Sequence, residues 1–81
     1  MSRSHRLFLR DIVDACQRLL AYQNGIDWND PTSSRMNLDA VMYNLLILGE
    51  ATKNLPENIR EEASDIEWRK IAGIRDVLAH G

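Results

Sequence analysis

Hydrophobic residues recur every three or four positions along the first third of the chain. In residues 5–22 the repeating positions are Leu9, Ile12, Val13, Cys16, Leu19 and Leu20. This spacing places one apolar stripe along an α-helix, with polar residues on the other face. Asn24 and Gly25 tolerate a positive φ, so we expect the helix to stop there. Residues 27–34 are rich in Asp, Asn, Pro and Ser, which predicts a connecting loop.

The second periodic segment, residues 36–54, is apolar on more than one side. One face is formed by Leu38, Val41, Met42, Leu45, Leu48 and Ala51, and further apolar groups come from Tyr43, Leu46 and Ile47. A helix of this kind needs more than one surface to bury against. The second surface belongs either to the core of this chain or to another copy of it. Ser33, Ser34 and Asn37 are candidate N-caps for this helix.

Two further helices are predicted in the last third of the chain. Pro56 suits the first position of a short helix that ends near Ser64. Asp65 is placed to cap another helix from about Ile66 to the chain end, with an apolar surface formed by Trp68, Ile71, Ala72, Ile74, Val77 and Leu78. No segment alternates with period two, so no strand is expected. The sequence predicts an all-α fold, an antiparallel helical bundle of about four helices in a single domain over residues 1–81.

Size and charge narrow the function classes. A chain of 81 residues buries a modest core, and small chains often gain stability by forming dimers. The net charge of −2 argues against a protein that coats nucleic acid through a broad basic surface, but it is compatible with an enzyme that binds a few phosphates locally. No signal peptide or membrane-spanning run is visible, which favours a cytoplasmic location.

Most candidate chemical sites lack supporting sequence features. Cys16 is the only cysteine, which excludes an intrachain disulfide and indicates a buried helix residue. Two histidines far apart, without paired carboxylates at ligand spacing, predict no metal site. There is no glycine-rich phosphate loop and no other indication of a cofactor. Gly73 is an isolated helix glycine, interpreted as a point of close helix packing.

The C-terminal segment carries the one promising combination. Asp76 and His80 are four residues apart and therefore neighbours on a helix, where the carboxylate can orient the imidazole for proton transfer near neutral pH. Arg75 lies five residues before His80, which turns the two side chains about 140° apart on a regular helix. On these residues alone, a solvated and salt-bridged helix end is the favoured alternative. His5 is expected to be an incidental surface residue.

Three stretches in order resemble the HepT-like proteins of the HEPN superfamily. Residues 44–51 (NLLILGEA) resemble the central helix of that family, and Leu55-Pro56 follows where a Leu-Pro step is typical. Residues 66–76 (IEWRKIAGIRD) and 77–81 (VLAHG) resemble its C-terminal motif. The similarity in order and spacing covers nearly the whole chain.

This resemblance implies a dimerising helical bundle that cleaves RNA without a metal ion. Toxin members of the family use an R-x4-H motif, whose residues correspond here to Arg75 and His80, with Asp76 as the polar residue after the arginine. His80 would act as general base or acid. Arg75 would bind the scissile phosphate and stabilise transition-state charge, and Asp76 would position one of them. In the dimer, two copies of the motif would face a shared cleft.

The resemblance also implies a partner. The usual partner in the family is a minimal nucleotidyltransferase antitoxin, and the resemblance implies that this partner modifies a tyrosine just after the motif. The chain ends at Gly81 without that tyrosine, so the modification is not transferred, and we expect the usual C-terminal segment to be lacking. The alternative to a ribonuclease toxin is a non-catalytic dimeric module that binds the nucleotidyltransferase. The intact pair of Arg75 and His80 favours the enzyme, whereas the expected lack of the C-terminal segment and the acidic net charge favour the module.

Overall fold

The computed structural model describes residues 4–80, in which the regular secondary structure is helical and no strand occurs. The helices are α1 (His5–Tyr22), α2 (Arg35–Lys53), α3 (Glu57–Glu61) and α4 (Trp68–His80), with short 3₁₀ turns at Gln23–Gly25 and Pro31–Ser34. The predicted all-α bundle of four helices is therefore confirmed. Gly81, the last residue of the C-terminal motif, lies outside the described residues.

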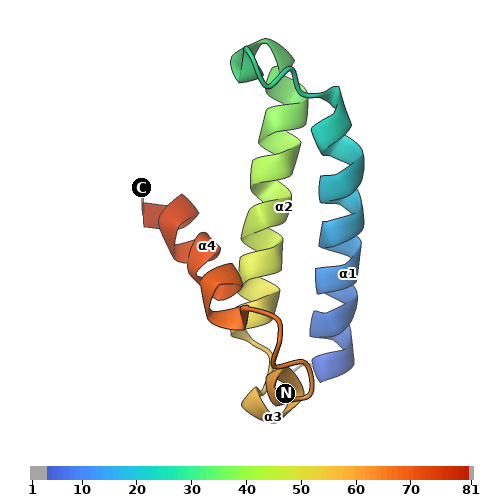
Figure 1. The fold of residues 1–81 in the computed structure, drawn as a ribbon, viewed down its shortest axis with the longest axis vertical. Helices are drawn as coiled ribbons and strands as arrows, with labels where there is room; N and C mark the ends of the chain where they lie inside the picture. The colour runs from blue at the N-terminus through green and yellow to red at the C-terminus, as the bar shows by residue number, and fades with distance from the viewer. Residues whose placement is uncertain (1–3, 81) are drawn as a thin grey trace.

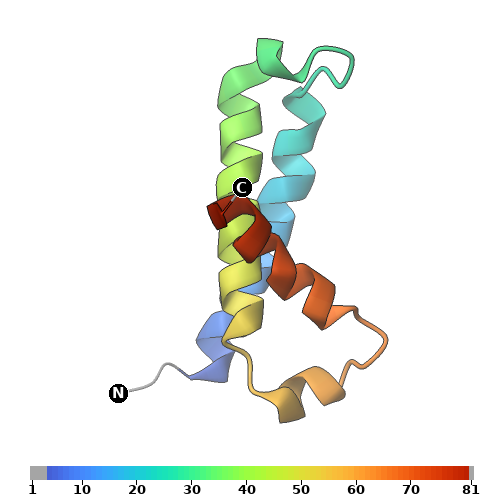
Figure 2. The same cartoon turned by 90° about the vertical axis from the view of Figure 1, so that its left-hand side faces the viewer.

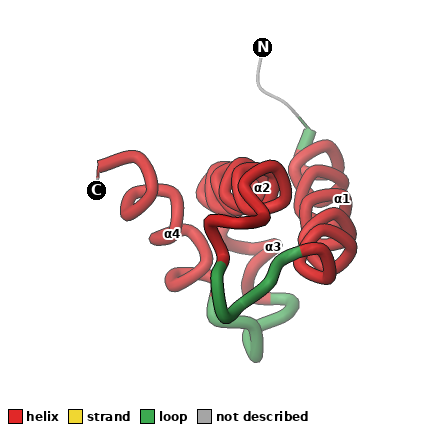
Figure 3. The backbone as a smooth tube through the Cα atoms, turned by 90° about the horizontal axis from the view of Figure 1, so that it is seen from above, coloured by secondary structure: helices red, strands yellow, loops and turns green. Residues whose placement is uncertain are grey.

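Helix α2 lies in the centre of the molecule, between α1 and α4 (Figures 1 and 3). It runs antiparallel to α1 along its whole length, and α4 returns along the opposite side of α2. Helix α4 crosses α2 at an angle (Figure 2), and its C-terminal half lies away from α2 (Figures 1 and 3). The most buried apolar side chains are Ala15, Ile26, Leu48, Ala51 and Leu55. This core lies mainly between α1 and the second half of α2. Because one side of α2 is buried against α1, its other side is left to face α4.

The connection between α1 and α2 differs from the prediction. Gly25 does not adopt a positive φ; the chain instead continues from α1 into the 3₁₀ turn. Glycine is needed there for space, because a Cβ at this position would lie 2.2 Å from Asn37 Nδ2. Asn37 Nδ2 donates to the carbonyl oxygen of Tyr22 at 3.0 Å, so Asn37 closes the end of α1 and does not cap α2. Ser34 occupies the N-cap position of α2, but its side chain makes no capping hydrogen bond.

The turn into α4 is held by a tryptophan. Trp68 Nε1 donates to the carbonyl oxygens of Arg60 at 3.1 Å and Ala63 at 3.0 Å. These carbonyls lie at the end of α3 and in the turns after it, which shortens α3 relative to the predicted helix. Glu67 immediately precedes α4, so the expected cap at Asp65 is wrong. Pro56 precedes α3 as its N-cap residue.

The face of α1 that points away from α2 is not covered by another described helix. Cys16 lies on this face and is exposed, so its predicted burial is wrong. Val13 and Leu20 on the same face are 51% and 65% exposed. The apolar stripe of α1 is thus wider than the contact with α2 can cover. Within residues 4–80, no helix is long and apolar enough to cross a bilayer.

Candidate active site

The candidate site is built where α2 and α4 are in tight contact, at Gly49. A Cβ at Gly49 would lie 2.7 Å from Cβ and 2.8 Å from the backbone nitrogen of Arg75. No side chain fits in that space, so glycine permits the two backbones to meet. Gly73 has no neighbouring atom within 4 Å of an added Cβ, so the close-packing glycine is Gly49 and not, as expected, Gly73.

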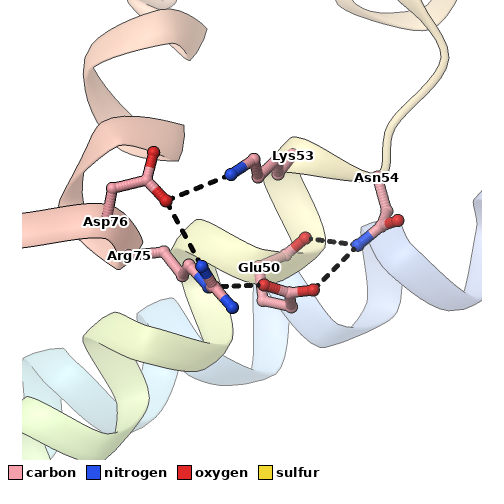
Figure 4. Close-up of polar contacts among 5 residues, drawn as sticks. All are labelled: Glu50, Lys53, Asn54, Arg75 and Asp76. Carbon is pink, nitrogen blue, oxygen red and sulfur yellow. Dashed lines mark hydrogen bonds and ion pairs between the residues drawn. The ribbon is translucent and has the colours of Figure 1, made fainter. Parts of the chain in front are cut away.

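This contact brings Arg75 beside Glu50, the residue that follows the close-packing glycine. Arg75 Nε and Glu50 Oε2 are 3.0 Å apart (Figure 4). The second carboxylate oxygen, Oε1, accepts a hydrogen bond from Asn54 Nδ2 at 3.4 Å, and the same amide donates to the backbone oxygen of Glu50 at 2.8 Å. Both oxygens of the Glu50 carboxylate are therefore engaged, which fixes the carboxylate that holds the guanidinium.

Asp76 links Arg75 to a lysine of α2. Its Oδ1 lies 3.1 Å from Lys53 Nζ and 3.4 Å from Arg75 Nη1 (Figure 4). The hydrogen bond and charge of Lys53, followed by those of Arg75, hold the pKa of the Asp76 carboxyl below its ordinary value. Asp76 is thus a carboxylate at neutral pH, where it holds two cations next to each other.

His80 lies apart from this polar network, which consists of Glu50, Lys53, Asn54, Arg75 and Asp76. It is an exposed residue at the end of α4, where the helix has left α2 (Figure 1). Its side chain makes no hydrogen bond or ion pair with any residue in the described range 4–80, whereas Asp76 contacts Lys53 and Arg75. Asp76 was expected to position either Arg75 or His80. Within the described residues it contacts Arg75 and not His80.

A recess opens beside the network on the side of α1. It has a volume of about 190 Å³ and is lined by Phe8, Asp11, Ile47, Glu50 and Ala51. The carboxylate that holds Arg75 therefore also forms part of the wall of a groove between α1 and α2. Among residues 4–80, no three histidines, cysteines or carboxylates gather closely enough to hold a metal ion.

Comparison with known proteins identifies the family. The family model described as "Ribonuclease HepT-like" matches residues 12–81, which include every residue of the network. This chain belongs to the HepT-like ribonuclease family. The resemblance expected from the Gly-Glu-Ala helix and the C-terminal motif is thereby confirmed.

Several curated relatives match over nearly the whole chain. A protein of Caldanaerobacter subterraneus subsp. tengcongensis with the name "Putative RNase" is 37% identical, over 96% of this chain and 70% of the relative. The "Probable ribonuclease HepT" of Thermococcus cleftensis is 35% identical, over 99% and 73%. A "Putative RNase" of Methanocaldococcus jannaschii is 30% identical, over 96% and 72%. No solved structure matches the chain.

Three members of the network in this HepT-like chain have no role that the sequence alone could assign. Glu50 was visible only as the middle residue of a Gly-Glu-Ala motif, and Lys53 and Asn54 only as the polar end of a helix. A signal was nevertheless present: a glycine within an apolar helix, followed by an ionisable residue, marks a place where another backbone approaches a charge. What the sequence lacks is the identity of the approaching segment.

Proposed function

We propose that this chain is a metal-independent endoribonuclease in which Arg75 and His80 act on the RNA backbone. The observation that supports this proposal best is the placement of Arg75. Two carboxylates occupy its Nε and one Nη1 hydrogen, and the remaining guanidinium N–H groups are left for an anion. An arginine fixed in this way binds a phosphate without having to be ordered first.

The reaction follows from the chemistry of RNA. The 2′-oxygen attacks the adjacent phosphorus and gives up its proton to a general base, while the bond to the 5′-oxygen breaks and that oxygen takes a proton from a general acid. The products are a 2′,3′-cyclic phosphate and a 5′-hydroxyl. His80 supplies the base or the acid. Arg75 neutralises the charge that develops on the phosphate oxygens, and Asp76 positions Arg75.

The active unit in this proposal is a dimer. Arg75 and His80 are five residues apart on α4, so they point about 140° away from each other. One copy cannot bring its own Arg75 and His80 together. In a dimer, α4 of the second copy can face the same cleft and supply the missing residue. The outer face of α2 offers apolar surface for such a contact: Met36 and Tyr43 are 86% and 64% exposed. Two such copies also provide two histidines, one for each proton transfer.

The biological setting that the family suggests is a toxin–antitoxin system. In this setting the chain is the toxin, and the partner is a minimal nucleotidyltransferase antitoxin. Support for this part comes from the family membership alone. Co-expression with a candidate nucleotidyltransferase tests it: the antitoxin is expected to relieve growth arrest caused by this chain. Growth arrest that persists despite a co-purifying nucleotidyltransferase would contradict it.

The ribonuclease proposal is tested with a labelled RNA in the presence of EDTA. The unmodified chain is expected to cleave it and to leave the 2′-deoxy version intact. Removal of a general acid or base typically lowers the rate by about 10²–10⁴, so His80→Ala should lose nearly all activity with an unchanged circular dichroism spectrum. His5→Ala is the matched control, because His5 is an exposed histidine at the other end of the chain. Equal cleavage by both variants would refute the assignment of His80.

The non-catalytic alternative gives a different result in the same experiment. A binding module for a nucleotidyltransferase would not cleave RNA, and it would retain partner binding when His80 is replaced. His80 is exposed and has no partner among the described residues. This observation favours the non-catalytic alternative over the enzyme.

A further inference from the structure

The polar network contains a second cation that the proposed mechanism does not use. Lys53 belongs to α2 and comes one helical turn after Gly49, so its side chain projects toward α4. Its Nζ lies 3.1 Å from Asp76 Oδ1, and this is the same oxygen that Arg75 Nη1 contacts at 3.4 Å. One carboxylate oxygen thus holds an ammonium and a guanidinium side by side (Figure 4).

Both cations keep unused hydrogen-bond donors. An ammonium has three donors, and in the described structure Lys53 uses one of them, on Asp76. The Lys53 side chain is 49% exposed, so its remaining donors face solvent. Arg75 likewise keeps one hydrogen of Nη1 and both of Nη2. The two sets of free donors lie next to each other because they share an anchor.

From this arrangement we infer that Lys53 is a second phosphate-binding residue, which binds the same phosphate of the RNA backbone as Arg75. The inference rests on the proposed ribonuclease function and adds a residue to it. A backbone phosphate presents two nonbridging oxygens, and two adjacent cations can each bind one. Lys53 then belongs to the substrate site, with Asp76 as the residue that positions it.

The charges of the network indicate that phosphate binding depends on the exact positions of the Lys53 and Arg75 side chains. Lys53 and Arg75 carry two positive charges, and Glu50 and Asp76 carry two negative charges. A cluster without net charge attracts a distant polyanion weakly, so its affinity must come from direct contacts. The lowered pKa of Asp76 keeps that carboxylate ionised over the whole neutral range, and both cations therefore stay in place.

Binding of a fluorescently labelled oligouridylate tests the inference, measured by anisotropy at several salt concentrations in the full chain carrying His80→Ala. Addition of Lys53→Ala should weaken binding about three- to tenfold, as expected for one lost charged contact. The slope of log affinity against log salt should fall by about 0.7, as for one phosphate contact to a single strand. Lys53→Arg, which keeps the cation, should restore most of the affinity.

Lys70→Ala is the matched control. Lys70 is an exposed lysine that pairs with Glu67 at the start of α4, outside the network. It removes the same charge and should leave affinity and salt slope nearly unchanged. An equal loss in the Lys53 and Lys70 variants, or no loss in either, would overturn the inference. A Lys53 variant that is less stable but has an unchanged salt slope would also overturn it, because the lysine would then only hold α4 against α2.

Asp76→Asn provides a second, independent test. It raises the net charge by one and removes the shared anchor of the two cations. If the positions of the two cations determine affinity, RNA binding weakens in spite of the added positive charge. Tighter binding would mean that Lys53 contributes only diffuse charge, and would overturn the inference. Cleavage by the unmodified chain tests the ribonuclease proposal separately, so failure of that proposal and failure of the Lys53 assignment give different results.

Discussion

A pair of glycine-to-alanine variants tests the central packing contact of the structure. Gly49 and Gly73 both lie within helices, in α2 and α4, so alanine gains about 1 kcal/mol of helix propensity at each position. They differ in surroundings. At Gly49 the new methyl group would lie 2.7 Å and 2.8 Å from Arg75 Cβ and N, and at Gly73 it would meet no atom within 4 Å.

The expected effects have opposite signs. The atoms next to Gly49 belong to the backbone and Cβ of Arg75, which cannot rotate away, so α4 must move. Overpacking of this kind costs about 1–3 kcal/mol, and we place Gly49→Ala near the upper end. After subtraction of the propensity gain, it should destabilise the fold by about 1–2 kcal/mol. Gly73→Ala should stabilise it by about 0.5–1 kcal/mol.

Urea unfolding followed by far-ultraviolet circular dichroism measures both variants, at one protein concentration because association would shift the midpoint. In thermal unfolding each kcal/mol corresponds to about 4–8 °C for a domain of this size. The variants should therefore fall on opposite sides of the unmodified chain. If Gly49→Ala is as stable as Gly73→Ala, α2 and α4 do not approach at Gly49, and the placement of Arg75 beside Glu50 is wrong.

Three further predictions concern other parts of the fold. Trp68→Phe should lower stability by about 1–2 kcal/mol in urea unfolding, because two backbone carbonyls lose their indole donor. The pKa of Asp76 is lowered in the folded state, so its pairing with Lys53 should stabilise the fold above about pH 4 and cease to do so as the pH falls further. In a plot of unfolding free energy against pH, the fall on the acid side should therefore be less steep for Asp76→Asn than for the unmodified chain. Cys16 should react with a thiol reagent in the native state nearly as fast as in urea, and a protected thiol would contradict its exposed position.

The helices themselves were largely predictable from the sequence. The predicted first helix agrees with α1 at both ends, and α2 begins and ends within one residue of the predicted segment. Periodicity determines such helices because each has an apolar stripe that must be buried. The short third helix was overestimated, since the side chain of Trp68, in the next helix, donates hydrogen bonds to the end of α3 and to the turns after it. Hydrophobic periodicity does not reveal a side-chain hydrogen bond of this kind.

Glycines were predicted less well than helices, for a physical reason. Gly25 was expected to supply a positive φ and Gly73 a close helix contact; instead, Gly25 makes room for Asn37, and the close contact is at Gly49. A glycine is selected either for its backbone freedom or for its lack of a side chain. Only the neighbouring segment decides which, and a single sequence does not identify that neighbour.

The two residues of the R-x4-H motif differ in how the fold supports them. Arg75 lies at a tight contact between α2 and α4, and two carboxylates hold its guanidinium. His80 lies beyond that contact, where α4 has left α2 and no described side chain orients it. A general acid or base must be held within hydrogen-bond distance of its proton, so a catalytic His80 requires a further surface against the end of α4. In our proposal a second copy supplies it, and cleavage should therefore fall on dilution in parallel with the fraction of dimer.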